Sequence, residues 1–393
     1  MSLRCVSSSF RLLSYAVGLM ATVASCQLDS DSKGTLPMGV SGSGETGSTD
    51  DGTDDPDSTG APSIEGPRKR RLDIAPAFAG GVGVGTLLVV LDGTRIEYED
   101  TQPDGSDLRF FGPEEAGAYP IEIEHWDPGG TSFVWVRIDS IALPDHLWMY
   151  YGDTPGFASL DPSAVWDGAF AAVWHMERGG SPTMPDTTAA GHDLQFIGFG
   201  GDLDVPGPIG LSVAMVPDDM ATAGPLELFD PGELALTDAF TLEAWVSTPV
   251  AADDSTHSVL RKTGSFELQT LEATSTRPKV VVRPEGVAGA QVAELGSSLA
   301  LDSWTYLAAT YRADTGVLSI FRNGALEGSI TVGGDAVARM LDVTDAALQV
   351  GHGLHGGLDE VRVSTIARAP EWIAVQHASM SDQLLTFGAP QPR

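Results

Sequence analysis

Short runs of β-type residues, separated by turn residues, recur along the chain from residue 68 onward. In the first part they lie at 86–91, 94–98, 108–111, 121–126, 133–138 and 147–151. Turn signals such as Asp92-Gly93 fall between them, at the spacing typical of strands in an all-β sandwich. The basic run 68–71 leads into Leu72 and begins the first expected strand. The pattern predicts a β-sandwich domain over residues 67–170.

The same pattern continues through the rest of the chain. Strands are expected at 241–246, 258–261, 266–271, 279–283, 304–311, 317–322, 325–330 and 348–350. One short helix is expected at 370–377, with Pro370 in its first turn. The chain is therefore expected to be all-β, with a second β-sandwich over residues 171–388.

The stretch Gly357-Leu-Asp-Glu-Val-Arg-Val363 has an unusual strand pattern. In a regular strand, Asp359 would share a face with Val361 and Val363. A carboxylate at the edge of an apolar face needs backbone N–H groups, a base or a cation to offset its burial. This position makes Asp359 a candidate ligand for a cation.

The first 25 residues have the features of a signal peptide. Arg4 and Arg11 precede an apolar run at 12–24 that is too short to span a bilayer. The run ends in Val23-Ala-Ser-Cys26, which resembles the lipobox of bacterial lipoproteins and implies lipidation of Cys26. Gln27 follows, which in Gram-negative lipoproteins favours transit to the outer membrane. Ordinary cleavage at the same small residues, leaving a secreted protein, is the alternative.

Residues 26–66 are expected to form a disordered acidic tether. From 27 to 66 there is no aromatic residue, and nine of the ten charged residues are acidic. The whole chain carries 54 acidic and 22 basic residues, for a formal net charge of −32. Such a charge disfavours nucleic acid as a partner, because a sequence-independent grip on phosphates requires a basic surface.

Several motifs resemble known bacterial families. The segments 240–246, 304–311 and 357–363, in this order, resemble the late strands of laminin-G-like, concanavalin A-type jelly rolls, and 171–177 and 186–193 resemble the opening of that module. His192 and Asp193 depart from its usual asparagine and glycine. Motifs between 104 and 153 are similar to an uncharacterised domain often found beside laminin-G-like modules. The resemblance implies a surface protein that binds a glycan, a matrix component or another envelope polymer.

The resemblance also implies candidate binding residues. Laminin-G-like jelly rolls commonly hold calcium through carboxylates and backbone carbonyls, which implies Glu177, Asp186 and Asp359 as ligands. A turn cap or a pairing with a base is the alternative for Asp359. Trp245 shares a strand face with Thr241 and Glu243, where its ring either stacks on a sugar or packs against a second layer.

The sequence gives only weak evidence for a catalytic site. Glu122 and Glu124 lie two apart on one expected strand, like the paired carboxylates of some glycoside hydrolases, but any solvent-facing strand shows this pattern. His352 and His355 flank glycines without a third zinc ligand suggested by the sequence. We expect a lipid-anchored protein of the outer membrane or cell surface with a binding or adhesion role and no catalysis. A purely structural envelope protein and a glycoside hydrolase are the alternatives.

Overall fold

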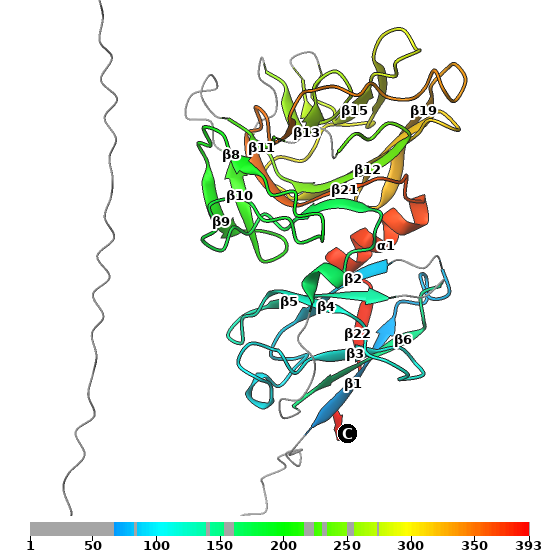
Figure 1. Cartoon of the computed structure of the whole chain (residues 1–393). Helices are drawn as coiled ribbons and strands as arrows, with labels where there is room; N and C mark the ends of the chain where they lie inside the picture. Colours follow the sequence, from blue (N-terminus) through cyan, green and yellow to red (C-terminus); the bar gives the residue numbers. More distant parts are fainter. Residues whose placement is uncertain are drawn as a thin grey trace, which may run out of the picture. The chain divides into compact units, whose positions relative to one another are not determined.

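The computed structural model describes residues 67–81, 85–138, 142–152, 161–215, 224–229, 234–249, 255–272 and 275–392 (Figure 1). These residues belong to one compact unit, Pro62–Arg393. The expected signal peptide, the lipidation site Cys26 and the acidic tether lie outside the described residues. Within the described ranges, no helix has the length and apolar character needed to cross a membrane.

The first domain consists of two antiparallel sheets. One has the strand order β22-β1-β6-β3 with β23 beside β1, and the other has the order β2-β5-β4. Their bounds are β1 Arg68–Ile74, β2 Gly85–Leu91, β3 Arg109–Phe111, β4 Ile121–His125, β5 Ser132–Ile138, β6 His146–Tyr151, β22 Leu385–Phe387 and β23 Gln391–Pro392. Both β22, at the end of the expected second domain, and β23, just beyond it, pair with β1, so the last part of the chain contributes strands to the first domain.

Residues 94–98 do not form the expected strand. They form a turn that leads into the 3-10 helix η1, Tyr98–Asp100. Asp92 organises this turn, since its Oδ1 accepts hydrogen bonds from the backbone N–H and the hydroxyl of Thr94 at 2.8 and 2.6 Å. Local bonds of this kind compete with strand pairing. A second 3-10 helix, η2, spans Pro162–Ala164.

The second domain also has two antiparallel sheets. We call the eight-stranded one, with the order β19-β18-β17-β12-β21-β10-β9 and β7 beside β21, the central sheet; the other has the order β16-β15-β14-β13-β20-β11-β8. The strands are β7 Phe170–Trp174, β8 Gln195–Phe196, β9 Asp202–Pro206, β10 Leu211–Met215, β11 Leu226–Leu228, β12 Ala239–Val246, β13 His257–Lys262, β14 Phe266–Leu271, β15 Lys279–Val282, β16 Gln291–Glu294, β17 Thr305–Arg312, β18 Val317–Arg322, β19 Ala325–Thr331, β20 Leu348–Val350 and β21 Gly356–Ser364. The expected helix is present as α1, Pro370–Met380. The prediction of an all-β chain of sandwich domains is confirmed.

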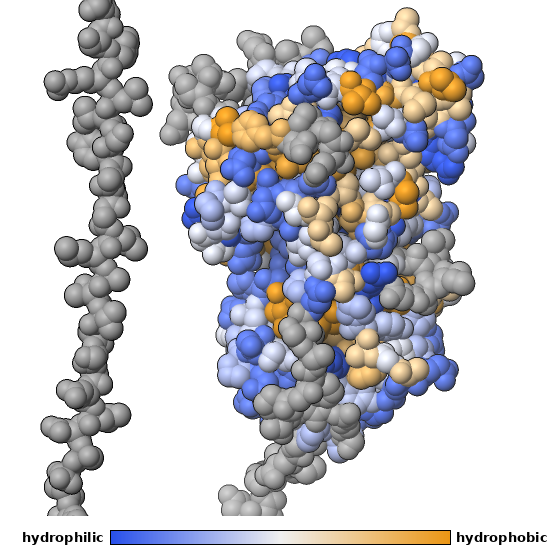
Figure 2. All heavy atoms as spheres, viewed as in Figure 1, coloured by the Kyte–Doolittle hydropathy of each residue, from blue (hydrophilic) through white to orange (hydrophobic). Residues whose placement is uncertain are grey.

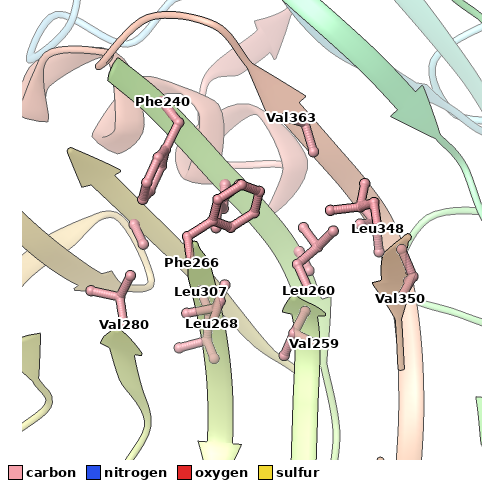
Figure 3. Packing of buried hydrophobic residues seen from close by; sticks show 14 of the residues in the cluster. Phe240, Val259, Leu260, Phe266, Leu268, Val280, Leu307, Leu348, Val350 and Val363 are labelled. Atoms are coloured by element: carbon pink, nitrogen blue, oxygen red, sulfur yellow. The ribbon is translucent and has the colours of Figure 1, made fainter. Parts of the chain in front are cut away.

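One face of the central sheet packs against the seven-stranded sheet to form an apolar core. Phe240 of β12 and Leu307 of β17 point from the central sheet toward Phe266 and Leu260 (Figure 3). The ring centroids of Phe240 and Phe266 lie 5.3 Å apart. Full burial of one such side chain stabilises the fold by about 1.5–3 kcal/mol. The alternation of β12 follows the sequence prediction, because its apolar residues face this core.

The other face of the central sheet is covered by α1 and the first domain. Trp245 of β12 and Tyr306 of β17 belong to the same apolar cluster as Leu88 of β2. The helix is hydrogen-bonded to β2, since Gln376 Nε2 donates to the carbonyl of Thr86 at 2.8 Å. The two domains therefore share one continuous core through this face.

Polar and apolar residues are intermixed on the outer surface. The face seen in Figure 2 shows hydrophilic residues distributed among smaller groups of hydrophobic ones. Among the described residues, Val337 and Val343 are the most exposed large apolar side chains, at 75% and 66%. Isolated exposed apolar residues are normal on soluble proteins and need no partner to explain them.

Candidate functional site

Strand β21 contains a β-bulge where the sequence predicts regular alternation. Glu360 has a φ of +50°, and the register between β12 and β21 shifts at this point. Asp359 pairs with Trp245, on the face that α1 covers, whereas Val361 faces the apolar core. The expected position of Asp359 on the face of Val361 is therefore wrong, because one inserted residue moves the preceding side chains to the other face.

Asp359 is fully buried and only half satisfied. Its Oδ2 accepts the backbone N–H of Ile209 at 3.1 Å, while its Oδ1 has no hydrogen-bond partner. A Cβ at Gly207 would lie 2.6 Å from Oδ2, so glycine is needed where this loop approaches the carboxyl group. Burial, together with Glu360 and Glu124, raises the pKa of Asp359 well above its ordinary value. Asp359 thus accepts a backbone hydrogen bond from the loop at 207–210, as a carboxylate that caps a turn does.

Asp186 organises the turn that opens the second domain. Its Oδ1 accepts the N–H groups of Val173 and Thr188, both at 2.9 Å. Its Oδ2 accepts the N–H of His192 and the hydroxyl of Thr188, both at 2.8 Å. Each oxygen already accepts two hydrogen bonds, which is the full capacity of a carboxylate oxygen. This arrangement provides a structural role for Asp186 and leaves no free oxygen for a cation.

Glu177, the third expected calcium ligand, lies beside a histidine of the first domain. Its Oε2 is 3.6 Å from His125 Nδ1, and burial raises the pKa of Glu177. Among the described residues, the acidic and histidine side chains close enough to share an ion are Glu124, His175 and Glu360. Since this group contains none of the three expected ligands, calcium binding by the second domain stays a prediction of the sequence.

Trp245 packs inside the protein. It is 7% exposed, and its Nε1 donates to Met380 Sδ of α1 at 3.4 Å. The rings of Tyr306 and His377 lie with their centroids 5.8 Å from that of Trp245. Of the two alternatives for Trp245, packing against a second layer fits this environment, because α1 covers the ring face on which a sugar would stack.

Glu122 and Glu124 lie on one face of β4, but this face is buried. Glu122 Oε2 accepts the indole N–H of Trp166 at 2.7 Å, and Glu124 Oε2 accepts that of Trp135 at 2.6 Å. The expectation of a solvent-facing strand is therefore wrong, because the first domain presents this face to the second. A glycoside hydrolase would need the two carboxylates to face a sugar.

A groove of about 300 Å³ lies where β21 begins. Its walls come from β9, β10, the segment after β12, the turn before β17 and the start of β21. Lining residues are Val205, Pro206, Ser212, Val213, Ala214, Met215, Ser247, Thr248, Pro249, Asp302, Trp304, His355, Gly356 and Gly357. The groove thus combines one indole ring with hydroxyl groups, a carboxylate and an imidazole.

Trp304 is half-buried and lies directly against the start of β21. A Cβ on Gly357 would be 2.4 Å from Cη2 of Trp304, so only glycine allows this approach. The N–H of Gly357 donates to the carbonyl of Ser247 at 3.1 Å, and the N–H of Ser247 donates to the carbonyl of Gly357 at 3.0 Å. These bonds fix the backbone under the ring. The sequence pattern of 304–311 predicts a packed strand and did not indicate that Trp304 borders a groove.

The two loop histidines have different environments. His355 lines the groove, whereas His352 is half-buried outside it, and burial lowers the pKa of His352. No zinc ligand set that includes either histidine is found among the described residues.

A larger pocket, of about 560 Å³, lies elsewhere on the second domain. It is lined by Asp238, Ala239, Arg312, Ala313, Asp314, Ala336, Val337, Met340, Ile366 and Ala367. Arg312 and Asp314 pair with each other at 2.6 Å, and the lining has no aromatic ring. The smaller groove with Trp304 is therefore the better candidate for recognition of a polar ligand with an apolar ring face.

Family comparisons match two segments of the chain. Residues 221–374 match the concanavalin A-like lectin/glucanases superfamily, in its laminin-G form. Residues 104–172 match a domain of unknown function (DUF2341). The chain thus combines a laminin-G-like domain with this uncharacterised domain, as its motifs predict. A search of curated proteins found no match.

Solved structures that are similar to part of this chain include toxin binding domains. The binding domain of botulinum neurotoxin DC in complex with SialylT has 12% identity and a TM-score of 0.42, covering 54% of this chain and 52% of that chain. The binding domain of Paraclostridial Mosquitocidal Protein 1 has 10% identity and a TM-score of 0.42, with the same coverages. The chain spans about half the length of these structures.

Proposed function

We propose that this protein binds a glycan or a related envelope or matrix polymer through the groove beside Trp304. The observation that carries the proposal is the half-buried indole held over Gly357, with Asp302 and His355 on the same groove. Sugars present an apolar ring face and a polar rim, so they suit a flat aromatic ring surrounded by hydrogen-bonding groups.

The size of the groove and the family support this proposal. Its volume of about 300 Å³ lies at the lower end of the usual range for small-ligand sites, which is about 300–1,000 Å³. A groove of this size suits a short segment of a polymer. The laminin-G-like segment belongs to a superfamily named for lectins and glucanases.

We also propose that the protein acts at the outer membrane or cell surface, held by lipid on Cys26. Multiple acyl chains give stable anchoring where a single chain gives only marginal binding. Labelled palmitate is expected to enter the native protein and carry it into a detergent phase. Cys26→Ser should lose both properties, and equal labelling of this variant would refute the anchor.

A glycan array tests the groove. The full chain with Cys26→Ser serves as a soluble probe, and Trp304→Ala is made in the same background. We expect Trp304→Ala to weaken binding at least tenfold, or about 1.4 kcal/mol, through loss of the stacking ring. Trp148→Ala is the matched control, since Trp148 is a half-buried tryptophan of β6 in the first domain. Unchanged binding by Trp304→Ala would refute the groove as the site.

Silence of the native protein on polysaccharides and peptidoglycan would instead favour a purely structural envelope protein. We propose binding without catalysis, so a broad glycoside screen should give no hydrolysis. Hydrolysis by the native chain that is lost in Glu124→Gln would overturn this part.

A further inference from the structure

His175, directly after β7, is surrounded by three carboxylates at the contact between the domains. Its Nδ1 lies 2.6 Å from Glu360 Oε1 and 3.5 Å from Glu124 Oε2, and its Nε2 lies 3.4 Å from Glu122 Oε1. The side chains of Glu124 and Glu360 are 2% and 0% exposed. Two carboxylates therefore converge on one ring nitrogen, and the third faces the other nitrogen.

Each carboxylate is held in place by a separate donor. Trp135 fixes Glu124 through its indole N–H, and Trp166 does the same for Glu122. Arg362 Nε donates to Glu360 Oε2 at 3.0 Å, which leaves Oε1 turned toward His175. The carboxylates around Nδ1 are thus held in place by side chains from both domains.

The group contains buried polar atoms without partners. Neither Glu124 Oε1 nor His175 Nε2 has a hydrogen-bond partner, although both atoms are inaccessible to water. Glu124 meets Nδ1 of His175 through its other oxygen. An unpaired carboxylate oxygen in a buried position is costly, so a missing positive partner would explain it.

The carboxylates around His175 also favour a cation at this position. Glu122, Glu124 and Glu360 surround the imidazole of His175, and Arg362 pairs with Glu360. Asp359, next to Glu360, is a further fully buried carboxyl group. A divalent ion bound among these carboxylates would offset part of their negative charge.

We propose that Glu124, His175 and Glu360 bind a divalent first-row transition-metal ion through the carboxylate oxygens and Nδ1. A nitrogen ligand disfavours calcium and magnesium, which prefer oxygen, and suits zinc and its neighbours. Glu122 then accepts the Nε2 proton of His175, the usual outer partner of a metal-bound imidazole. Glu122 is a positioning residue for the ion.

The geometry requires little rearrangement. The donor atoms of Glu124, His175 and Glu360 lie within 4.8 Å of one another. In a tetrahedral zinc site with ligands at about 2.1 Å, the corresponding separation is roughly 3.4 Å. Binding therefore requires His175 Nδ1 and Glu360 Oε1, now 2.6 Å apart, to separate by less than about 1 Å. Gly210 lies beside this group, since a Cβ there would be 3.4 Å from Glu124 Oε1 and 3.7 Å from Glu177 Oε2.

The ion would connect the two domains. Glu124 belongs to β4 of the first domain, whereas His175 directly follows β7 and Glu360 belongs to β21 of the second. A ligand that binds only the native state stabilises it, so a bound ion should raise the free energy of unfolding. The proposal does not rest on glycan binding, and its test does not use a glycan.

Zinc is the probe. The full chain with Cys26→Ser is stripped with chelator, and zinc chloride is titrated in calorimetry and in thermal unfolding. We expect one zinc ion per chain and a Tm several degrees higher than with chelator. Glu124→Gln and His175→Gln should each weaken binding at least tenfold and abolish the Tm increase. Glu124→Gln keeps an acceptor for the Trp135 indole, so it tests the charge with little change in shape.

Glu243→Gln is the matched control. Glu243 is a fully buried carboxylate on the covered face of the same central sheet but outside the proposed ligand set. Its substitution should leave the zinc response intact. Glu122→Gln should weaken binding by about 10–100-fold, as expected for an outer partner of a metal ligand.

Bound Co²⁺ gives a readout that does not depend on stability. The native protein should show the visible d–d absorption of coordinated cobalt, and His175→Gln should lose it while its near-UV circular dichroism stays native. Absence of zinc binding by the native chain would overturn the proposal. An equal zinc response in the native, Glu124→Gln and His175→Gln proteins would also overturn it, because the ion would then bind elsewhere.

Discussion

The two faces of the central sheet are stabilised in different ways. On the face toward the seven-stranded sheet, the central-sheet side chains labelled in Figure 3 (Phe240, Leu307 and Val363) are all apolar. The face toward α1 and the first domain buries Glu243, Glu360 and Arg362 together with aromatic rings. Strand β21 contributes to both faces, so the difference arises within a single strand.

The difference shows what each face demands of a side chain. On the apolar face, volume and shape decide the fit. On the covered polar face, every charge needs a partner: Arg362 lies 4.4 Å over the Trp135 ring and donates to Gln376 at 3.1 Å. The hydroxyl of Tyr306 donates to Glu243, and burial raises the pKa of Glu243. Removing one partner of such a network is costly, whereas replacing the whole network by apolar groups of similar volume need not be.

The largest effect is expected from Arg362→Ala. Removal of this guanidinium leaves Glu360 without the ion pair of Arg362 in a fully buried site. Breaking a buried pair in this way costs about 3–5 kcal/mol. Urea unfolding at neutral pH measures the loss. Arg312→Ala is the control, because the Arg312–Asp314 pair is exposed and its loss should cost at most about 1 kcal/mol. Equal effects of the two substitutions would remove the distinction between buried and surface charge.

An intermediate effect is expected from Leu307→Ala on the apolar face. Leu307 is 0% exposed, and its truncation leaves a cavity that costs about 2–5 kcal/mol. Leu307→Met, which conserves volume, should cost less than about 1.5 kcal/mol. The comparison of their urea midpoints tests whether volume alone controls this face. A loss as large for methionine as for alanine would contradict that view.

The smallest effect is expected at the rim of the covered face, where Asp167 pairs with Arg368. The guanidinium donates to both carboxylate oxygens at 3.0 and 2.9 Å. Burial raises the pKa of Asp167, but Arg368 outweighs it and lowers the pKa below 3.8. Folding is therefore favoured by this pair above pH 3.8, and the contribution disappears as the pH falls through the lower folded pKa.

Asp167→Asn should cost about 1 kcal/mol at pH 7, and the cost should shrink as the pH falls toward 3. Urea unfolding of both proteins across this range measures the difference. A constant difference between native protein and variant at all pH values would exclude the ion pair as its source.

The sequence predicts the elements of this fold well, because most strands of both domains have a local pattern. The runs at 133–138 and 317–322, for example, become β5 and β18 with nearly the same bounds. Short strands such as β8 and β22 were missed, since two or three residues carry too little periodicity. The bulge at Glu360 was missed because a non-glycine residue with positive φ has no local signal in the printed sequence.

The candidate sites depend on contacts that the sequence does not specify. His175 meets Glu360 across 185 residues and Glu124 across the contact between domains. Two glutamates on β4 predict a shared face but not what covers it. Trp304 becomes part of a groove only because Gly357 lets the ring approach the backbone. The Gly356-Gly357 pair is the one local signal that favours such an approach.

The return of the chain to β1 has a consequence for the order of folding. Leu72 of β1 pairs with Phe387 of β22, and Arg68 pairs with Pro392 of β23. The first sheet therefore stays open at one edge until nearly all of the second domain has been synthesised. Pairings between residues so distant in sequence slow folding, since loop closure must precede the contacts that offset it. An unpaired β1 edge is meanwhile able to pair with other chains, so folding intermediates of this protein should need protection from association until the last strands arrive.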